Sequence, residues 1–452
     1  MPDRIARTGW ATFSSTRVRD EEDLCVIDVL MEDPIIIWEN ENRSSGLRSG
    51  YFRPYNNTYE RFGKHASKQQ DWPRSAGKQA MPERIRIHSR HIIRTLEAVQ
   101  SGKLFDAGGP VVMTRPFKAL AYYGEPIRRK LRALEQIFKP QETRERKDID
   151  AKDGDDLADF KARCEHLRCL VEFMDTYLLE KQQFLASEDC KSAAFTDLWH
   201  LFQPDDEVVE STKCRQAYQV IYVGGSAHKA EPPRASLAAK PAHTSLTVTC
   251  ADLDFDGTRL GHVTKKFEIE PFEGERLITS LPVYPLRFAP GSERGQSLRQ
   301  TLIQRGLMFL DAAKIAHMYH SGPAVETGEE IDGQVVVDFE EAFSPKNKRN
   351  WQPALESLAE SSGTRLSSGN NTEPCNGTCC VNDTVYDDNF VDDLQFKDHI
   401  ARLTADDGTA YPRVLQQGNE STVPDNDLLI MSYRVFGFVF STRKWGKLDL
   451  YL

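Results

Sequence analysis

Three aspartates at alternate positions are the residues most suggestive of chemistry in this sequence. Asp252, Asp254 and Asp256 are followed directly by Gly257, a pattern typical of the start of a calcium-binding loop. Such a loop needs oxygen ligands at alternate positions, a glycine at its sharp turn and a bidentate glutamate at its twelfth position. Val263 occupies that twelfth position, so the strongest ligand of the motif is missing. We therefore assign no calcium site to these aspartates.

The segments on either side of the aspartates predict a β-hairpin instead. Residues 245–250 before them and residues 262–272 after them are rich in Thr, Val, Phe and Ile and alternate as strands do. A calcium loop of this kind lies between two helices. An Asp-Gly pair between alternating segments is a strong hairpin signal, and Asp256-Gly257 is such a pair. The sequence thus predicts two strands joined by a tight turn.

A cluster of three thiols is the second candidate for chemistry. Cys375, Cys379 and Cys380 lie within six residues, and the first two have the spacing of one half of a zinc site. Structural zinc normally takes a second pair of ligands, and no such pair is evident. The chain has nine cysteines, an odd number that favours reduced intracellular thiols. Two hypotheses therefore stand: a metal-binding protein that uses this cluster, or free and transiently oxidised loop thiols.

Two pairs of histidines have the spacing of neighbours on a helix. His88 and His91 are three residues apart, as are His317 and His320, and on a helix this places both rings on one face. A metal site also needs a third ligand and a supporting shell of hydrogen bonds. No His-Glu-x-x-His motif accompanies either pair. We therefore expect surface histidines.

The motifs of nucleotide binding and of nucleophilic catalysis are missing from the sequence. It contains neither a G-x-x-x-x-G-K-[ST] phosphate loop nor a G-x-S-x-G elbow. The stretch VVVDFEE, Val335–Glu341, is similar to the metal-binding strand of an ATPase, but without a phosphate loop we expect an ordinary strand with exposed acids. We assign no catalytic residue, no cofactor-binding residue and no metal ligand beyond the cysteine candidates.

Composition disfavours several classes of partner. The chain has 452 residues and a formal net charge of −10, which argues against nucleic acid and anionic membranes as partners. No apolar run approaches the roughly 20 residues that span a bilayer. The first residues lack the apolar core of a secretory signal. We expect an intracellular protein, cytoplasmic or nuclear, that is not secreted and binds a protein partner or substrate.

The hydrophobic period divides the chain into a helical and a strand-forming part. Apolar residues recur at helical spacing over residues 88–202, and the period changes to two over residues 207–340. We predict an α+β fold, in which helices pack beside a small, mostly antiparallel β-sheet or barrel, with disordered linkers. The predicted regions are a variable, partly disordered region at 1–80, an accessory domain at 81–345, a flexible linker with the cysteine cluster at 346–392, and a last segment at 393–452.

Local signals place four elements near the candidate residues. Ser89 is the expected N-cap of a helix that follows it. A second helix is predicted over residues 297–322, and a strand over residues 333–343. Near the end of the chain, a hairpin is predicted around Ser441–Arg443.

The strand-forming part, taken as a whole, resembles a known family. The segments LDFDG, SLPVYPLRF and W-x-x-LDL, at residues 253–257, 280–288 and 445–450, are the most specific parts of the likeness. They come in the order found in the N-terminal half of a family of large fungal AAA+ ATPases. In that family, a domain of unknown function precedes the ATPase core. The resemblance covers residues 84–452.

The resemblance implies an accessory function. In the family, the segment similar to residues 434–452 leads into the ATPase core, and the catalytic residues of that core have no counterpart here. We expect no ATP hydrolysis by this chain itself, with ATP and Mg²⁺ used by full-length relatives and ring assembly only where an ATPase core is attached. The expected function is recognition of a partner or substrate, or regulation, in a truncated form of such an ATPase. The alternative is a stand-alone protein-interaction module that lacks any ATPase.

Overall fold

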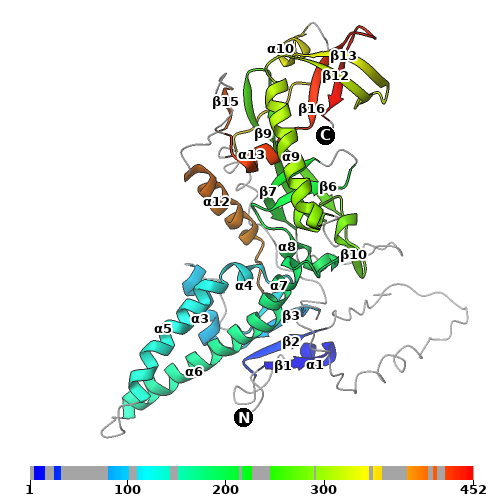
Figure 1. The fold of residues 1–452 in the computed structure, drawn as a ribbon. Helices are drawn as coiled ribbons and strands as arrows, with labels where there is room; N and C mark the ends of the chain where they lie inside the picture. The colour runs from blue at the N-terminus through cyan, green and yellow to red at the C-terminus, as the bar shows by residue number, and fades with distance from the viewer. Residues whose placement is uncertain are drawn as a thin grey trace, which may run out of the picture. The chain divides into compact units, whose positions relative to one another are not determined.

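The structure is a computed structural model that divides into two compact units, each described by itself below (Figure 1). Unit 1 consists of residues 1–184, 227–242 and 372–388, and unit 2 contains the rest of the chain. The structure describes residues 5–15, 25–31, 80–100, 109–142, 151–212, 216–225, 245–289, 292–345, 350–358, 384–405, 411–414 and 423–450.

Unit 1 is built on a five-stranded sheet with the strand order β1-β2-β3-β4-β14. The pairs β1–β2 and β4–β14 are parallel, and the pairs β2–β3 and β3–β4 are antiparallel. The strands are β1 (Ile5–Thr8), β2 (Ile27–Leu30), β3 (Arg84–Ile87), β4 (Val111–Thr114) and β14 (Thr384–Val385). The first two strands show that part of the variable region at 1–80 pairs into this sheet.

A buried arginine links the sheet of unit 1 to a short helix, α1 (Trp10–Ser15). Arg86 on β3 is fully buried, and its Nη1 donates to the carbonyl oxygen of Phe13 at 2.7 Å. The guanidinium also lies 4.0 Å from the centre of the Phe13 ring. A buried charge is tolerated only when its polar atoms have partners, so α1 and β3 depend on each other.

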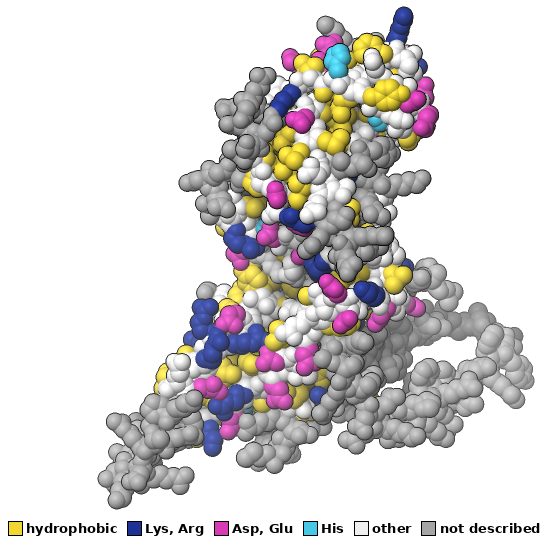
Figure 2. Space-filling view, in the orientation of Figure 1, with side chains coloured by type: hydrophobic (Ala, Val, Ile, Leu, Met, Phe, Trp, Pro, Cys, Tyr) yellow, Lys and Arg dark blue, Asp and Glu magenta, His cyan; other side chains and the backbone are white. Residues whose placement is uncertain are grey.

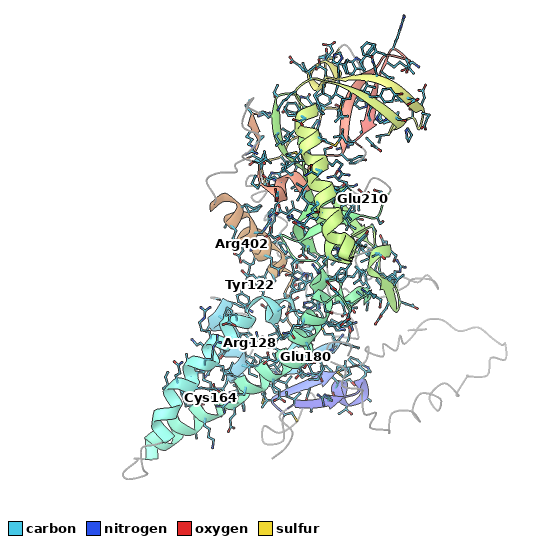
Figure 3. All side chains as sticks on the ribbon, viewed as in Figure 1. Tyr122, Arg128, Cys164, Glu180, Glu210 and Arg402 are labelled. Atoms are coloured by element: carbon cyan, nitrogen blue, oxygen red, sulfur yellow. The ribbon has the colours of Figure 1, made fainter. Side chains whose placement is uncertain are left out.

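The helices of unit 1 form from the segments with helical apolar spacing. They are α3 (Arg90–Gln100), α4 (Lys118–Tyr122), α5 (Gly124–Glu142) and α6 (Ala151–Phe173), and α6 continues through a π-helical turn, η2 (Met174–Leu179). Ser89 is the N-cap predicted from the sequence, because its Oγ accepts from the backbone N–H of Ile92 at 3.3 Å. Arg128 of α5, which is labelled in Figure 3, donates to the carboxylate of Asp175 in η2 at 2.5 Å.

Unit 2 contains a six-stranded antiparallel sheet with the order β11-β6-β7-β8-β9-β15. Its strands are β6 (Glu207–Glu210), β7 (Ala217–Gly224), β8 (Leu246–Phe255), β9 (Arg259–Ile269), β11 (Val283–Pro285) and β15 (Arg413–Val414). The predicted hairpin is confirmed, since β8 and β9 pair along their whole length and Gly257 adopts φ +97° at the turn. Pro285 lies on the edge strand β11, where its missing N–H breaks no ladder.

One face of the six-stranded sheet is covered by the helix α12 (Phe390–Ala405). The apolar cluster between them consists of Ile221, Ala251, Leu358, Phe396 and Ile400. Several short elements precede or flank this sheet. They are α7 (Glu180–Ala186), which spans the division between the units, β5 (Ser192–Ala194), η3 (Phe195–Asp197), α8 (Leu198–Leu201), β10 (Glu275–Leu277), η4 (Ile278–Ser280) and η5 (Leu286–Phe288).

A four-stranded antiparallel sheet with the order β12-β13-β16-β17 forms the second part of unit 2. The strands are β12 (Ala316–Pro323), β13 (Glu330–Val337), β16 (Arg434–Val439) and β17 (Lys444–Asp449), and the neighbouring helices are α9 (Ser292–Ala312), α10 (Phe339–Ala342) and α13 (Asp425–Leu429). The hairpin predicted around Ser441–Arg443 is confirmed as β16–β17.

The helix predicted over residues 297–322 is wrong in its second part. The helix α9 ends at Ala312, and Ile315 adopts φ +66°, which turns the chain into the strand β12. A left-handed residue of this kind cannot continue a helix. Residues 316–323 carry apolar side chains that fit either period, and pairing with β13 decides for the strand.

The predicted α+β class is confirmed, with open sheets in place of a closed barrel. Among the residues that the structure describes, no helix is both long and apolar enough to cross a membrane.

Candidate functional site

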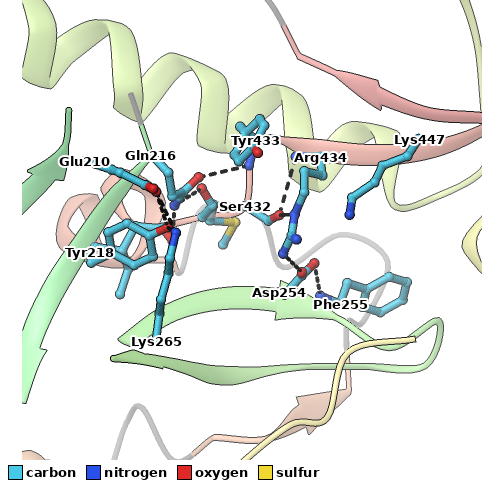
Figure 4. Close-up of polar contacts among 12 residues, drawn as sticks. Glu210, Gln216, Tyr218, Asp254, Phe255, Lys265, Ser432, Tyr433, Arg434 and Lys447 are labelled. Atoms are coloured by element: carbon cyan, nitrogen blue, oxygen red, sulfur yellow. Dashed lines mark hydrogen bonds and ion pairs between the residues drawn. The ribbon is translucent and has the colours of Figure 1, made fainter. Parts of the chain in front are cut away.

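The aspartates of β8 lie on one face of the six-stranded sheet, together with residues of the neighbouring strands. Asp252 and Asp254 alternate with the buried Leu253, so both project from the same face of β8. Across the β8–β9 ladder, Lys265 pairs with Cys250 and therefore shares that face. We call the following six residues the acid–base cluster: Glu210, Tyr218, Asp252, Asp254, Lys265 and Arg434. Figure 4 labels all of them except Asp252.

Arg434 at the start of β16 is the counter-charge of Asp254. Its Nη2 donates to Asp254 Oδ2 at 3.0 Å, and the Asp254 side chain is only 3% exposed. The preceding segment fixes this approach, because the N–H of Leu253 donates to the carbonyl of Ile430 and the N–H of Ser432 donates to the carbonyl of Leu253. The pair therefore joins the six-stranded sheet to the four-stranded sheet.

Lys265 is the centre of the second half of the cluster (Figure 4). Its Nζ donates to Glu210 Oε2 at 2.7 Å and to the Tyr218 hydroxyl at 3.2 Å. The Tyr218 hydroxyl donates in turn to Glu210 Oε2 at 3.0 Å. The same Nζ lies 4.9 Å from the centre of the Phe267 ring. These contacts satisfy the charges with hydrogen bonds, as partly buried ion pairs require.

Gln216 holds the segment before β16 against the cluster. Its side-chain amide donates to the carbonyls of Ile430 and Met431, at 3.2 and 3.1 Å. Its side-chain oxygen accepts from the N–H of Tyr433 at 3.1 Å. This buried amide adds to the single parallel bridge between Leu253 and Met431, so Arg434 is placed by hydrogen bonds to the backbone as well as by charge.

The pKa values of two aspartates and of the arginine in the cluster are all raised, for different reasons. Burial, followed by the neighbouring Asp254 carboxylate, raises the pKa of Asp252 to about 7. Burial also raises the pKa of Asp254. Burial by itself lowers the pKa of Arg434, but the carboxylates of Asp254 and Asp252 outweigh it and raise that pKa. Lys447 beside the cluster has its pKa lowered by burial and then by the charge of Arg434.

The geometry of the three aspartates is that of a structural hairpin. Asp256 Oδ1 accepts from the N–H groups of Thr258 and Arg259, at 2.8 and 2.6 Å, within its own turn. Asp254 forms an ion pair with Arg434. Within the described part of the chain, no group of three or more His, Cys, Asp or Glu side chains is arranged to hold a metal ion. The carboxylates therefore serve the turn and the ion pair.

The structure separates the histidines that the sequence placed in pairs. His88 lies before α3, and its Nε2 is 2.8 Å from Asp28 Oδ2, while His91 lies within α3. His317 and His320 are on the strand β12, where a spacing of three places them on opposite faces. The expectation of surface histidines is wrong for His320, which is 9% exposed, and for His88, whose side chain is 7% exposed. Cys375, Cys379 and Cys380 lie outside the described residues.

A second candidate site is an aromatic face on the four-stranded sheet. The ladder aligns His317, Val336, Phe438 and Trp445 in one row across all four strands. A second row begins with Tyr319 opposite Gln334, and the N–H of Phe440 donates to the carbonyl of Gln334. These seven residues on one side of the sheet are the aromatic face: His317, Tyr319, Gln334, Val336, Phe438, Phe440 and Trp445.

The aromatic face is open to solvent. Tyr319 is 66% exposed and Phe440 is 50% exposed. The ring of Phe438 contacts those of Phe440 and Trp445, with centroids 5.9 and 5.7 Å apart. Figure 2 shows hydrophobic and acidic side chains exposed together over β12 and β13. Exposed aromatic side chains that form a continuous surface are typical of a binding site.

At the row of Phe436, next to that of Phe438, the same side of the sheet is covered, which marks where the open face ends. Phe436 is 2% exposed and contacts the rings of Phe339, Phe343 and Trp351. The row of Phe436 thus belongs to the core and the row of Phe438 to the surface. The pattern that signals this face is Arg434, Phe436, Phe438 and Phe440 at alternate positions, which on a strand places all four side chains on one side.

The comparisons with known proteins bear on part of unit 2. Residues 183–290 match the model of a domain of unknown function, DUF7025. The match includes β6 to β9, and hence five of the six residues of the acid–base cluster, with Arg434 as the exception. No curated protein and no solved structure gives a significant match.

Proposed function

We propose that this chain is a non-catalytic recognition region that binds a protein partner through the aromatic face. The observation that carries the proposal is the exposure of Tyr319 and Phe440 beside the row of His317, Val336, Phe438 and Trp445. Exposed aromatic side chains lose contact with water on binding and are enriched among the residues that dominate protein interfaces.

The acid–base cluster supports this proposal as a structural element. Arg434 is the first residue of β16, and its ion pair with Asp254 fixes the strand that presents Phe438 and Phe440. In this cluster, Asp254 is held by Arg434, and Glu210 is held by Lys265 and by a hydrogen bond from Tyr218. An ion pair of this kind positions a surface more than it adds stability.

The resemblance to fungal AAA+ ATPases gives the proposal its finer form. We infer that the chain belongs ahead of an ATPase core and selects the partner or substrate on which that core acts. The alternative is a stand-alone interaction module without an ATPase. The two are separated by sequencing the transcript beyond the codon for Leu452. A reading frame that continues into a G-x-x-x-x-G-K-[ST] loop favours the first, and a stop codon with a native mass near 51.3 kDa favours the second.

Photo-crosslinking tests the recognition function. A photoreactive phenylalanine analogue replaces Tyr319 in one variant and Ile137, a 54% exposed residue of α5, in a control variant. We expect a discrete adduct from position 319 only, and loss of that adduct when Phe440→Asp is added. The captured protein, purified, should bind the wild-type chain about tenfold or more tightly than the Phe440→Asp variant. Equal adducts from both positions would contradict the proposal.

A further inference from the structure

The two edge strands of the four-stranded sheet, β12 and β17, are protected to different degrees. The edge of β17 is partly occupied, because the N–H of Val325 donates to the carbonyl of Lys447 at 2.9 Å, and this strand also carries Lys444. The strand β12 contains no Asp, Glu, Lys or Arg, and its one proline is its last residue, Pro323. Edge strands are normally blunted by charges, prolines or a covering segment. The strand β12 thus lacks the usual features that keep another strand away.

The register of the β12–β13 ladder determines which backbone groups of β12 point outward. The N–H of Ala324 donates to the carbonyl of Glu329 at 2.9 Å, and this pair continues the ladder. Bonded pairs alternate in an antiparallel ladder, so the even-numbered residues of β12 bond to β13. The N–H and C=O groups of His317, Tyr319 and Ser321 therefore point away from β13. In the described part of the chain, no strand pairs with this side of β12.

The outward groups have the spacing that an extended polypeptide matches. They recur at every second residue, about 6.8 Å apart, which is the repeat at which a neighbouring strand presents its own N–H and C=O groups. The side chains of the same three residues are exposed, and Ile315 directly before the strand is 61% exposed. Unpaired backbone groups beside exposed apolar side chains favour an extended peptide segment as the occupant.

We propose that an extended, basic segment of the partner protein adds to the four-stranded sheet as one more strand beside β12. The inference rests on the recognition function proposed for the aromatic face and names the way in which the partner binds. The residues of the added strand that lie opposite His317 and Tyr319 extend the two rows of the aromatic face, and they should be apolar. In strand addition, backbone hydrogen bonds give affinity and alternate side chains give specificity.

The charges around β12 require a basic residue in the added strand. Residues 315–341, which contain β12 and β13, include several acids and no Lys or Arg. Glu326 is paired with Lys447, but Glu330 and Asp332 are exposed and, within the described part of the chain, form no ion pair. Acids without a counter-charge attract a basic segment. They also disfavour β12 of a second copy as the occupant, because two acidic segments would then meet.

The ladder also places this basic residue within the added strand. Asp332 lies directly opposite Ser321, on the side of the aromatic face, and accepts a hydrogen bond from the Tyr319 hydroxyl at 3.0 Å. A Lys or Arg opposite Ser321 passes over this small side chain to reach Asp332, across two strand spacings of about 10 Å in all. The partner segment should therefore carry two apolar residues and one Lys or Arg at successive alternate positions.

Peptide display tests the inference on the full chain. Random peptides of strand length are selected on the immobilised wild-type chain, and the enriched sequence is synthesised with a fluorescent label. We expect the alternating pattern of two apolar residues and one Lys or Arg. Fluorescence anisotropy then measures the dissociation constant of this peptide. On the wild-type chain, N-methylation at alternate peptide positions should abolish binding, and N-methylation at the positions between them should not, because only every second N–H faces β12.

Two variants of the chain test the edge and the charge separately. Ser321→Pro removes an outward N–H without breaking a bond to β13, and it should weaken peptide binding about tenfold or more. Its control, Ser321→Ala, keeps the N–H and should bind within about twofold of the wild type. Asp332→Lys should weaken binding of the basic peptide and favour a peptide with Glu at the basic position. Circular dichroism checks that each variant is folded, and the N-methylated peptides need no variant.

The outcomes separate this inference from the proposed function. Strand addition is wrong if no alternating basic peptide is enriched, or if N-methylation at all positions has the same effect. If position 319 crosslinks a protein whose binding falls with Phe440→Asp but not with Ser321→Pro, the recognition function stands and strand addition is wrong. A dimer of the chain that Ser321→Pro disrupts would assign the edge to a second copy and overturn the basic segment. If position 319 crosslinks no protein and no peptide is enriched, both proposals are wrong.

Discussion

Arg434 Nη2 lies 3.0 Å from Asp254 Oδ2, although 180 residues separate the two in the sequence. Asp254 belongs to the segment that matches a domain of unknown function, and Arg434 lies outside it. The hairpin β16–β17 is therefore held in place by a charge on a strand of the matched segment. The presentation of the aromatic face depends on this long-range pair.

Removing the guanidinium should destabilise the chain strongly. In Arg434→Met, the Asp254 carboxylate stays buried without its counter-charge, which typically costs about 3 to 5 kcal/mol. Urea unfolding measures the loss. The matched control is Lys266→Met, which removes an exposed ion pair with Glu268 and should cost under about 1 kcal/mol. Equal losses for the two variants would mean that the Asp254 pair is not a buried one.

Asp252→Asn should change the pH dependence of stability in a defined direction. The pKa of Asp252 is about 7 in the folded chain, against about 3.9 in an unfolded one. Between these values the folded state holds the extra proton, so this contribution to stability is present at low pH and lost as the pH rises through 7. Asparagine carries no charge, so the stability of the variant relative to the wild type should increase as the pH rises, by up to about 1.4 kcal/mol per pH unit. A constant difference from pH 4 to pH 8 would contradict the assignment.

The buried His262 should make stability depend on pH in the opposite direction to Asp252. Burial, and then the nearby charge of His399, lowers the pKa of His262 to about 4, against about 6.5 in an unfolded chain. The unfolded state therefore binds the extra proton, and stability falls as the pH falls from 6.5 towards 4. The variant His262→Gln does not have this loss, so its stability relative to the wild type should increase as the pH falls. The same unfolding series measures it, and a gain on raising the pH would show the sign to be wrong.

Gly306 should not tolerate a side chain. A Cβ at this position of α9 would lie 2.2 Å from the backbone carbonyl oxygen of Leu428 in α13, so the backbone of one of the two helices would have to shift. Gly306→Ala should lower the free energy of unfolding by about 2 kcal/mol or more. Gly333→Ala is the control, because a Cβ there meets nothing within 4 Å, and its effect should stay under about 1 kcal/mol. Similar effects would show that α9 and α13 are not in close contact.

Asp256 should matter for the turn and not for calcium. Its Oδ1 accepts from Thr258 and Arg259, so Asp256→Ala should cost about 1 to 2 kcal/mol, and Asp256→Asn, which keeps an acceptor oxygen, should cost less. Calcium chloride should leave the thermal unfolding midpoint of the wild-type chain unchanged. A rise that Asp256→Ala abolishes would restore the calcium hypothesis.

Local signals were enough to predict the elements that depend on neighbouring residues. The Asp-Gly turn of β8–β9, the N-cap Ser89 and the last hairpin follow from short-range chemistry, and the structure has all three. The strand β12 was predicted as helix because its residues fit both periods, and its strand form is fixed by pairing with β13. The intrinsic propensity of these residues alone does not decide between helix and strand.

The candidate site was only partly predictable for the same reason. Two acids on a buried strand require a cation from elsewhere in the chain, but no local sequence pattern near Asp254 indicates that Arg434 is that cation. The aromatic face has a visible signal in the alternation of Phe436, Phe438 and Phe440. Which of these rings is exposed depends on where Phe339 and Trp351 pack, and this follows only from the tertiary structure.

The pairing of β13 with β16 also sets an order of events during synthesis. Val337 leaves the ribosome about a hundred residues before Gly437, its partner in the ladder. In that interval the edge of β13 lacks its hydrogen-bonding partner β16, and the carboxylate of Asp254 lacks its counter-charge Arg434. The edge of β13 therefore stays unpaired until β16 is synthesised, and the same strand then brings Arg434 to the Asp254 carboxylate.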